Sequence, residues 1–222
     1  MDARRQFHGD LQVLQQDLLK MGSLVEESIF KAVRSLTEQD LQLAEQVLAG
    51  DDLIDQMEID IETRSLQLIA LQQPMAGDLR ILGTALKAVT DLERMADHSV
   101  DIAKVVLRMN RQPWIKPLID IPRMADKARS MLREALDAFV AHDAKRAKQV
   151  ADDDDEVDAL YDQVYRELLT YMIADPSSLE RATWLLWVAH NLERIADRVT
   201  NICERVVYEV TGRLDDMNVS KY

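Results

Sequence analysis

Two short segments of the chain carry the same pair of carboxylates at the same spacing. Residues 93–97 read Glu-Arg-Met-Ala-Asp, and residues 193–197, 100 positions later, read Glu-Arg-Ile-Ala-Asp. Because a Glu and an Asp four residues apart lie on one face of a helix, their like charges repel unless a cation offsets them. Carboxylate oxygens are ligands of hard and borderline metal ions. The repetition therefore predicts a cation site in each half of the chain.

The carboxylate row is longer in the first copy than in the second. Asp101 continues the spacing of Glu93 and Asp97, whereas Asn201 stands at the corresponding place after Glu193 and Asp197. An amide oxygen can bind a cation but adds no negative charge to the site. The second site is therefore expected to hold one negative charge fewer than the first.

A second acidic cluster precedes each motif. Asp52 and Asp55 in the first half match Asp155 and Asp158 in the second half at a shift of 103 residues. In an antiparallel hairpin, the start of the second helix of each half lies beside the end of the third. Each Asp pair is therefore expected to face a Glu–Asp motif, so that two helices supply four or more carboxylates to one metal site.

Both acidic features also have simpler explanations, which the sequence leaves open. A row of carboxylates on an acidic helical protein can be an ordinary solvated face. Asp residues near the start of a helix are stabilised by the helix macrodipole. Under these explanations the chain is a structural helical adaptor without metal, whereas the repeated spacing favours metal sites.

The other residue types argue against an enzyme. The histidines are His8, His98, His142 and His190, and none follows a Glu by three residues, as the ligands of di-iron bundle enzymes do. The six glycines are scattered rather than gathered in a nucleotide-binding loop, and no nucleophile–base set is evident. A non-enzymatic protein is therefore expected, with a carboxylate-bridged metalloenzyme as the alternative hypothesis.

Six long helices are expected to position these residues. Apolar residues recur at spacings of three and four, and segments containing Pro and Gly interrupt the pattern. The helices are expected at approximately residues 11–36, 40–71, 79–109, 124–139, 144–172 and 179–211. The predicted fold class is therefore all-α. Because the two halves match each other in sequence, two tandem pseudo-repeated three-helix bundles are expected, at residues 1–112 and 113–222.

Composition restricts the class and the location of the protein. The 222 residues are 47% hydrophobic and carry a net charge of −13. No basic stripe of useful size is visible along the sequence, so a nucleic-acid partner is not expected. The single cysteine allows a reducing compartment, and neither a signal peptide nor an apolar run of about 18 residues is found. We expect a cytoplasmic protein that meets the membrane only peripherally, through partners.

Several short motifs occur in a fixed order along the chain. They are Met-Gly-Ser-Leu-Val-Glu-Glu at 21–27, Asp-Leu-Ile-Asp at 52–55, the turn segment 74–80, and the Leu-Glu-Arg-x-Ala-Asp segments that begin at Leu92 and Leu192. Each motif alone is weak, but their order and spacing together are specific. On these motifs the chain resembles the PhoU family, the phosphate-uptake regulators of bacteria, over nearly its whole length.

The resemblance implies metal binding by the repeated carboxylates. In some family members, a Glu or Asp followed four residues later by Asp holds multinuclear metal clusters on the bundle surface. On this chain the motif falls on Glu93, Asp97 and Asp101, and in the second half on Glu193 and Asp197, where the row ends. Divalent or trivalent ions are implied, with iron or zinc foremost and magnesium, manganese or calcium as alternatives.

The resemblance also implies a regulatory role. PhoU-like proteins are cytoplasmic adaptors between the phosphate ABC transporter, including its ATPase, and a phosphate-sensing histidine kinase, and they are commonly homodimers. When phosphate is plentiful, they restrain uptake and keep the kinase from activating the phosphate-starvation genes. A related adaptor of a different transporter is the alternative, and direct binding of phosphate is left open.

Overall fold

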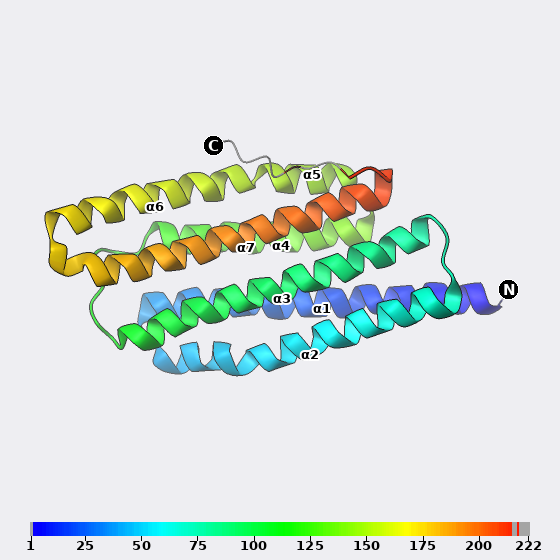
Figure 1. The fold of residues 1–222 in the computed structure, drawn as a ribbon, viewed down its shortest axis with the longest axis horizontal. Helices are drawn as coiled ribbons and strands as arrows, with labels where there is room; N and C mark the ends of the chain where they lie inside the picture. Colours follow the sequence, from blue (N-terminus) through cyan, green and yellow to red (C-terminus); the bar gives the residue numbers. More distant parts are fainter. Residues whose placement is uncertain (1, 215–216, 218–222) are drawn as a thin grey trace.

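The computed structural model describes residues 2–214 and 217. Every regular element in this part of the chain is a helix, as Figure 1 shows, so the expected all-α fold is confirmed. The elements are α1 (Asp2–Glu38), α2 (Leu41–Gln72), α3 (Gly77–Met109), α4 (Asp120–Ala141), α5 (Ala144–Asp152), α6 (Asp154–Ala174), the 3-10 turn η1 (Pro176–Ser178) and α7 (Leu179–Thr211). None of these helices has the length and apolar character needed to cross a membrane.

Polar caps and left-handed residues set the helix ends. Asp40 caps α2 by accepting a hydrogen bond from the backbone N–H of Leu43 at 3.0 Å. Gln73, with a φ of 45°, ends the same helix just before Pro74. Gly212 adopts a φ of 71°, a left-handed conformation that suits glycine, and ends α7. The turns that reverse the chain therefore lie close to where the sequence predicts them.

The first helix is longer than expected. It begins at Asp2, whereas the sequence pattern indicated a start near Leu11. Phe7 and Leu11 are both buried at 5% exposure, four residues apart on the same face. The expected start was wrong because Phe7 extends the buried apolar row by a further turn.

The fifth expected helix is divided into α5 and α6 at Asp153. Four consecutive Asp residues at 152–155 repel one another and have low helix propensity. The backbone tightens here, because the N–H of Asp153 donates to the carbonyl of Val150 at 3.2 Å, three residues back. Lys127 of α4 stabilises the break through Asp153 Oδ1 at 3.2 Å and Glu156 Oε2 at 2.8 Å. A single continuous helix over 144–172 was therefore not the correct prediction.

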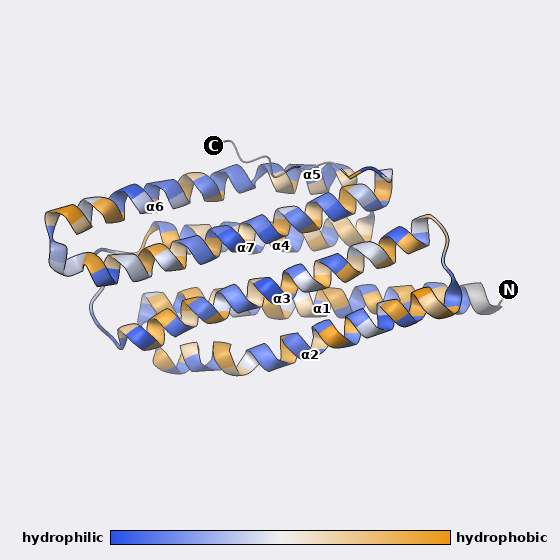
Figure 2. Cartoon of the chain, viewed as in Figure 1, coloured by the Kyte–Doolittle hydropathy of each residue, from blue (hydrophilic) through white to orange (hydrophobic). Residues whose placement is uncertain are grey.

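Each half of the chain forms an antiparallel three-helix bundle. The first contains α1, α2 and α3, and the second contains α4, the α5–α6 line and α7 (Figure 1). The halves pack through two helix pairs, α3 against α7 and α1 against α4, around one continuous apolar core. Figure 2 shows apolar and polar residues alternating along each helix, as expected for helices with one buried face. The division into domains at residues 1–112 and 113–222 stays a prediction.

The contact between α3 and α7 has approximate two-fold symmetry. Asp91 accepts a hydrogen bond from Arg198 at 3.3 Å, and His98 Nδ1 lies 2.9 Å from Asn191 Oδ1. Asp91 and Asn191 are 100 residues apart, and so are His98 and Arg198. Exchanging α3 and α7 therefore converts the first pair into the second, as a two-fold axis between two antiparallel helices requires. The axis therefore passes midway between these pairs, at the level of the two Glu-Arg-x-Ala-Asp motifs.

Candidate metal centre

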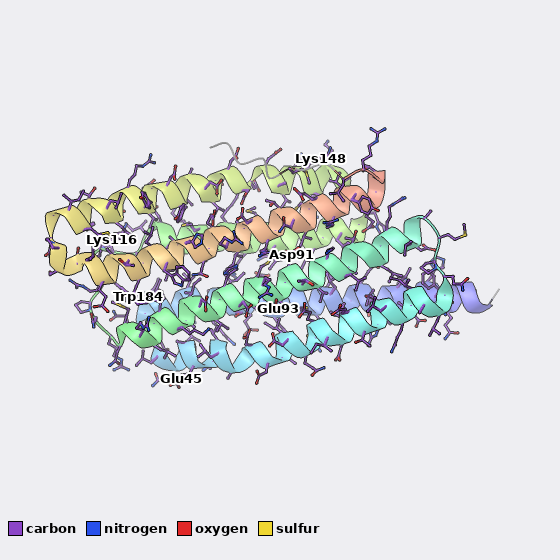
Figure 3. The ribbon with its side chains drawn as sticks, in the orientation of Figure 1. Glu45, Asp91, Glu93, Lys116, Lys148 and Trp184 are labelled. Atoms are coloured by element: carbon purple, nitrogen blue, oxygen red, sulfur yellow. The ribbon has the colours of Figure 1, made fainter. Side chains whose placement is uncertain are left out.

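Carboxylates of α2 and α3 come together in the first half. Burial raises the pKa of Glu93 to about 7, and the negative charge of Asp97 adds to the rise. The charges of Glu58 and Asp55, both on α2, act in the same direction. Figure 3 shows Glu93 on the side of α3 that faces α2. Carboxylates of the second helix therefore lie within electrostatic reach of the motif on the third.

Asp51 also belongs to this group, although the sequence analysis did not select it. Burial raises the pKa of Asp51 to about 6, and the charges of Asp55 and Asp97 contribute further. Lys104 has the opposite, smaller effect. We call Asp51, Asp55, Glu93 and Asp97 the first carboxylate cluster.

The second half repeats this arrangement. Asp154 is only 8% exposed, and burial together with the charges of Asp158, Asp197 and Glu193 raises its pKa to about 7. Burial likewise raises the pKa of Glu193 to about 7, with the charges of Asp197 and Asp158 adding to it. We call Asp154, Asp158, Glu193 and Asp197 the second carboxylate cluster.

At the start of each Asp pair, the side chain that turns inward belongs to the residue one position earlier than predicted. Asp52 and Asp155 are exposed, whereas Asp51 is half-buried and Asp154 is buried. Asp51 and Asp154 are counterparts at the same shift of 103 residues that relates Asp52 to Asp155. The repeat therefore also relates Asp51 to Asp154, but the rotation of the helix that turns these two side chains inward was not predicted.

Basic side chains balance part of the first cluster. Arg94 Nη1 donates to Asp97 at 3.0 Å, and its Nε lies 3.4 Å from Glu93. Lys104 Nζ lies 3.0 Å from Asp101, whose side chain is 39% exposed. Asp101 thus continues the row as predicted but is already paired with a cation of its own helix.

Asn201 and His98 are held at the contact between α3 and α7. Asn201 Nδ2 donates to Asp91 Oδ1 at 3.3 Å, beside Arg198. His98 is bound to Asn191, and burial lowers the pKa of its imidazole, which favours the neutral form. The structure therefore places Asn201 at the interface between the halves, outside the second carboxylate cluster.

The donor chemistry of both clusters suits a cation. Four of their carboxyl groups have pKa values of about 6 to 7, so near neutral pH protons still compensate the crowded charge. A metal ion can replace these protons, because it lowers the pKa of the oxygens that bind it. In the second cluster, Glu193 Oε2 is buried without a hydrogen bond and lies 3.4 Å from His190 Nδ1.

The clusters contain suitable metal ligands, but these side chains do not lie close enough together to bind one ion. Among the described residues, no three His, Cys, Asp or Glu side chains are already gathered closely enough to coordinate one ion. Arg94 also occupies two of the carboxylates of the first cluster. A metal ion would therefore require rotation of carboxylate side chains and, in the first half, displacement of Arg94.

The fold and the site geometry define the class of protein, which is a helical bundle repeated twice with a carboxylate cluster in each half. A profile described as the PhoU domain matches residues 18–106 and 121–206, one segment in each half. The chain belongs to the PhoU family, and the resemblance inferred from its motifs is confirmed.

Relatives of known name support the same family over the full length. The chain is 43% identical over 216 residues to a "Phosphate-specific transport system accessory protein PhoU homolog" of Clostridium acetobutylicum, covering 97% of this chain and 99% of the relative. A protein of the same name from Aquifex aeolicus is 41% identical, over 92% of this chain and 93% of the relative. These names describe accessory proteins rather than enzymes, in agreement with the non-enzymatic protein that the sequence predicted.

Solved structures agree with the fold. The crystal structure of the phosphate transport system regulatory protein PhoU from Streptococcus pneumoniae aligns with a TM-score of 0.88 and 35% identity, over 95% of this chain and 99% of that one. PhoU from Pseudomonas aeruginosa aligns with a TM-score of 0.89 and 37% identity, over 93% and 100%. The prediction of tandem three-helix bundles of the PhoU type is thereby confirmed.

Proposed function

We propose that the protein is a cytoplasmic, non-enzymatic negative regulator of phosphate uptake and of the phosphate-starvation response. It acts as an adaptor between the phosphate ABC transporter, through its ATPase, and the sensor histidine kinase. The observation that carries this proposal is the full-length similarity to proteins named as accessory to phosphate-specific transport. In the proposal the protein works as a homodimer and meets the membrane only through these partners.

The experiment that tests this role is an assay of alkaline phosphatase in a deletion strain grown at high phosphate, with the wild type alongside. High activity in the deletion strain, restored to the low wild-type level by the gene on a plasmid, supports negative control. Unchanged activity would instead favour the alternative role, an adaptor of a different transporter. Light scattering of the purified protein tests the dimer.

The proposal includes one metal site in each half. The first and second carboxylate clusters would hold divalent or trivalent ions, with iron or zinc foremost and magnesium, manganese or calcium as alternatives. A bound ion supplies positive charge that cross-links the second and third helices of its half. The chain's own part is to hold carboxylates from two helices within electrostatic reach, which the raised pKa values of Glu93 and Glu193 indicate.

Metal retention after dialysis, measured by mass spectrometry, tests these sites. Glu93→Gln with Asp97→Asn should remove the metal of the first cluster and leave that of the second. The matched control is Glu45→Gln with Asp162→Asn, two exposed positions that carry the same charge change. If wild type, variant and control retain the same amount of metal, the proposed sites are wrong.

A further inference from the structure

The second half contains a tight turn that the first half lacks. α5 and α6 follow each other along one line (Figure 1), and the break between them lies at Asp153. Gly50, 103 residues earlier, lies inside the continuous helix α2. At the break, the N–H of Asp153 donates to the carbonyl of Val150 at 3.2 Å, and the N–H of Glu156 donates to the carbonyl of Asp153 at 3.1 Å. Both hydrogen bonds span three residues, as in a 3-10 helix.

The tight turn coincides with the deeper burial of one carboxylate. Each residue of a 3-10 turn advances by about 120° around the axis, compared with about 100° in an α-helix, so the turn rotates the residues that follow it. Asp154 comes directly after the break and is only 8% exposed, whereas its counterpart Asp51 is half-buried. In this position Asp154 lies within electrostatic reach of Glu193 and Asp197 on α7. The rotation at the turn therefore accounts for the inward direction of Asp154.

A lysine of α4 spans this turn. Lys127 Nζ lies 3.2 Å from Oδ1 of Asp153, where α5 ends, and 2.8 Å from Oε2 of Glu156, in the first turn of α6. The side chain of Lys127 is 21% exposed, and its hydrogen bonds to Glu156 and Asp153 raise the pKa of its ammonium group above the usual value. Lys127 therefore stays charged and ties both sides of the break to α4.

The first half has an apolar contact at the corresponding place. The three residues that form the Lys127 contacts have counterparts at a shift of 103 residues, which are Leu24, Gly50 and Leu53. These counterparts line a small cavity of about 90 Å³ between α1 and α2. Leu24 carries no charge that could hold a break, and Gly50 carries no carboxylate that could receive it. The contacts of Lys127 are therefore specific to the second half and are not required by the fold.

Holding Asp154 in place affects how tightly an ion binds. A carboxylate that must first turn toward the ion loses conformational freedom on binding, whereas one that is already held in place loses little. Residues that orient metal ligands from behind therefore raise metal affinity, commonly by about tenfold or more. Lys127 is placed for this effect, because Asp153, which it contacts, immediately precedes Asp154.

We propose that Lys127 is a positioning residue of the second carboxylate cluster. By holding the turn on both sides of the break, it keeps Asp154 directed toward the carboxylates of α7 and so raises the affinity of this cluster for a cation. The inference rests on the proposed metal function, but the hold of Lys127 on the turn does not need a metal ion. Because the first half has no such contact, only the second cluster depends on it.

The test is a calorimetric titration of the purified full-length protein with Zn²⁺ and, separately, with Fe²⁺ in the absence of oxygen. The parent variant carries Glu93→Gln and Asp97→Asn, so that the second cluster is the one measured. Lys127→Met is added to the parent, because it removes the charge and keeps an apolar side chain where the first half has Leu24. The matched control is Lys20→Met, at an exposed position, and Lys127→Arg keeps the charge.

Lys127→Met should weaken metal binding by about tenfold, whereas Lys20→Met and Lys127→Arg should stay within about twofold of the parent. Asp154→Asn should weaken binding as well. Lys127→Met should then add little to Asp154→Asn, because both changes act on the same ligand. A substitution that only loosens the fold would add its full effect to that of Asp154→Asn. Full additivity, or equal affinity in Lys127→Met and the parent, would overturn the proposal.

Hydrogen exchange in EDTA follows the turn without a metal ion. The amides of residues 150–158 should exchange faster in Lys127→Met than in the parent, and those of residues 47–55 in α2 should be unchanged. Equal exchange at the turn would also overturn the proposal. If the parent binds neither ion, the proposed metal site itself is contradicted, and the role of Lys127 in metal binding with it. Tight binding that Lys127→Met leaves unchanged would contradict the role of Lys127 alone.

Discussion

Replacing Asp154 by Asn should stabilise the protein at alkaline pH in the absence of metal. Asp154 is the most buried carboxyl of the second carboxylate cluster, and it shares this site with Asp158, Glu193 and Asp197. Asn has nearly the same size and remains polar, but it carries no charge. The substitution therefore removes a crowded negative charge without leaving a cavity.

The magnitude follows from the pKa. Burial and neighbouring carboxylates raise the pKa of Asp154 from 3.8 to about 7 in the folded protein. A carboxyl whose pKa is higher in the folded state makes the protein less stable as pH rises from the unfolded value to the folded one. About two units of this pKa rise, from 5 to about 7, lie within the range from pH 5 to pH 8. At about 1.4 kcal/mol per unit, the free energy of unfolding should fall by about 3 kcal/mol over this range. The Asp154→Asn variant should not show this part of the loss.

Urea unfolding at pH 5 and pH 8 in EDTA measures the effect. The free energy of unfolding should fall less between these pH values in Asp154→Asn than in wild type, with a difference of about 3 kcal/mol. Asp162→Asn, at an exposed position of the same helix, is the control and should change the pH dependence by less than about 0.5 kcal/mol. An identical pH dependence in wild type and Asp154→Asn would refute the electrostatic account of the cluster.

Three further predictions concern stability. Asp91→Ala should cost about 2–3 kcal/mol in urea unfolding, because it leaves Arg198 without its partner at the α3–α7 contact; no loss would mean that the pair is not important there. Gly22→Ala should cost about 1–3 kcal/mol in thermal unfolding, because its Cβ would overlap Leu136 Cδ1. Gly83→Ala, with nothing within 4 Å, should instead stabilise α3 by up to about 1 kcal/mol, and equal effects would contradict this packing.

The helices could be predicted because their signals are local. Apolar spacing and the breaks at Pro74 and Gly212 placed most ends within a few residues of the observed ones. The break at Asp153 could not be predicted from periodicity, because Val150 and Val157 keep the apolar row through it. What divides the helix is repulsion among adjacent Asp residues and a contact to Lys127, which only the fold reveals.

The sequence indicated which acidic segments lie near the Glu-Arg-x-Ala-Asp motifs. It did not indicate which residues of each segment turn toward them. The shift of 103 residues identified both Asp clusters, but the rotation of the helix decides that Asp51 and Asp154 face the motifs.

The measurement that tests the account most directly is complementation of the deletion strain at high phosphate, read as alkaline phosphatase activity. The wild-type gene should restore low activity, and the exposed-site control Glu45→Gln with Asp162→Asn should do the same. A variant that lacks the half-buried Glu of each cluster, Glu93→Gln with Glu193→Gln, should leave the activity high at an equal protein level. Full repression by this variant would contradict a role for the carboxylate clusters, and failure of the wild-type gene to repress would contradict the regulatory function itself.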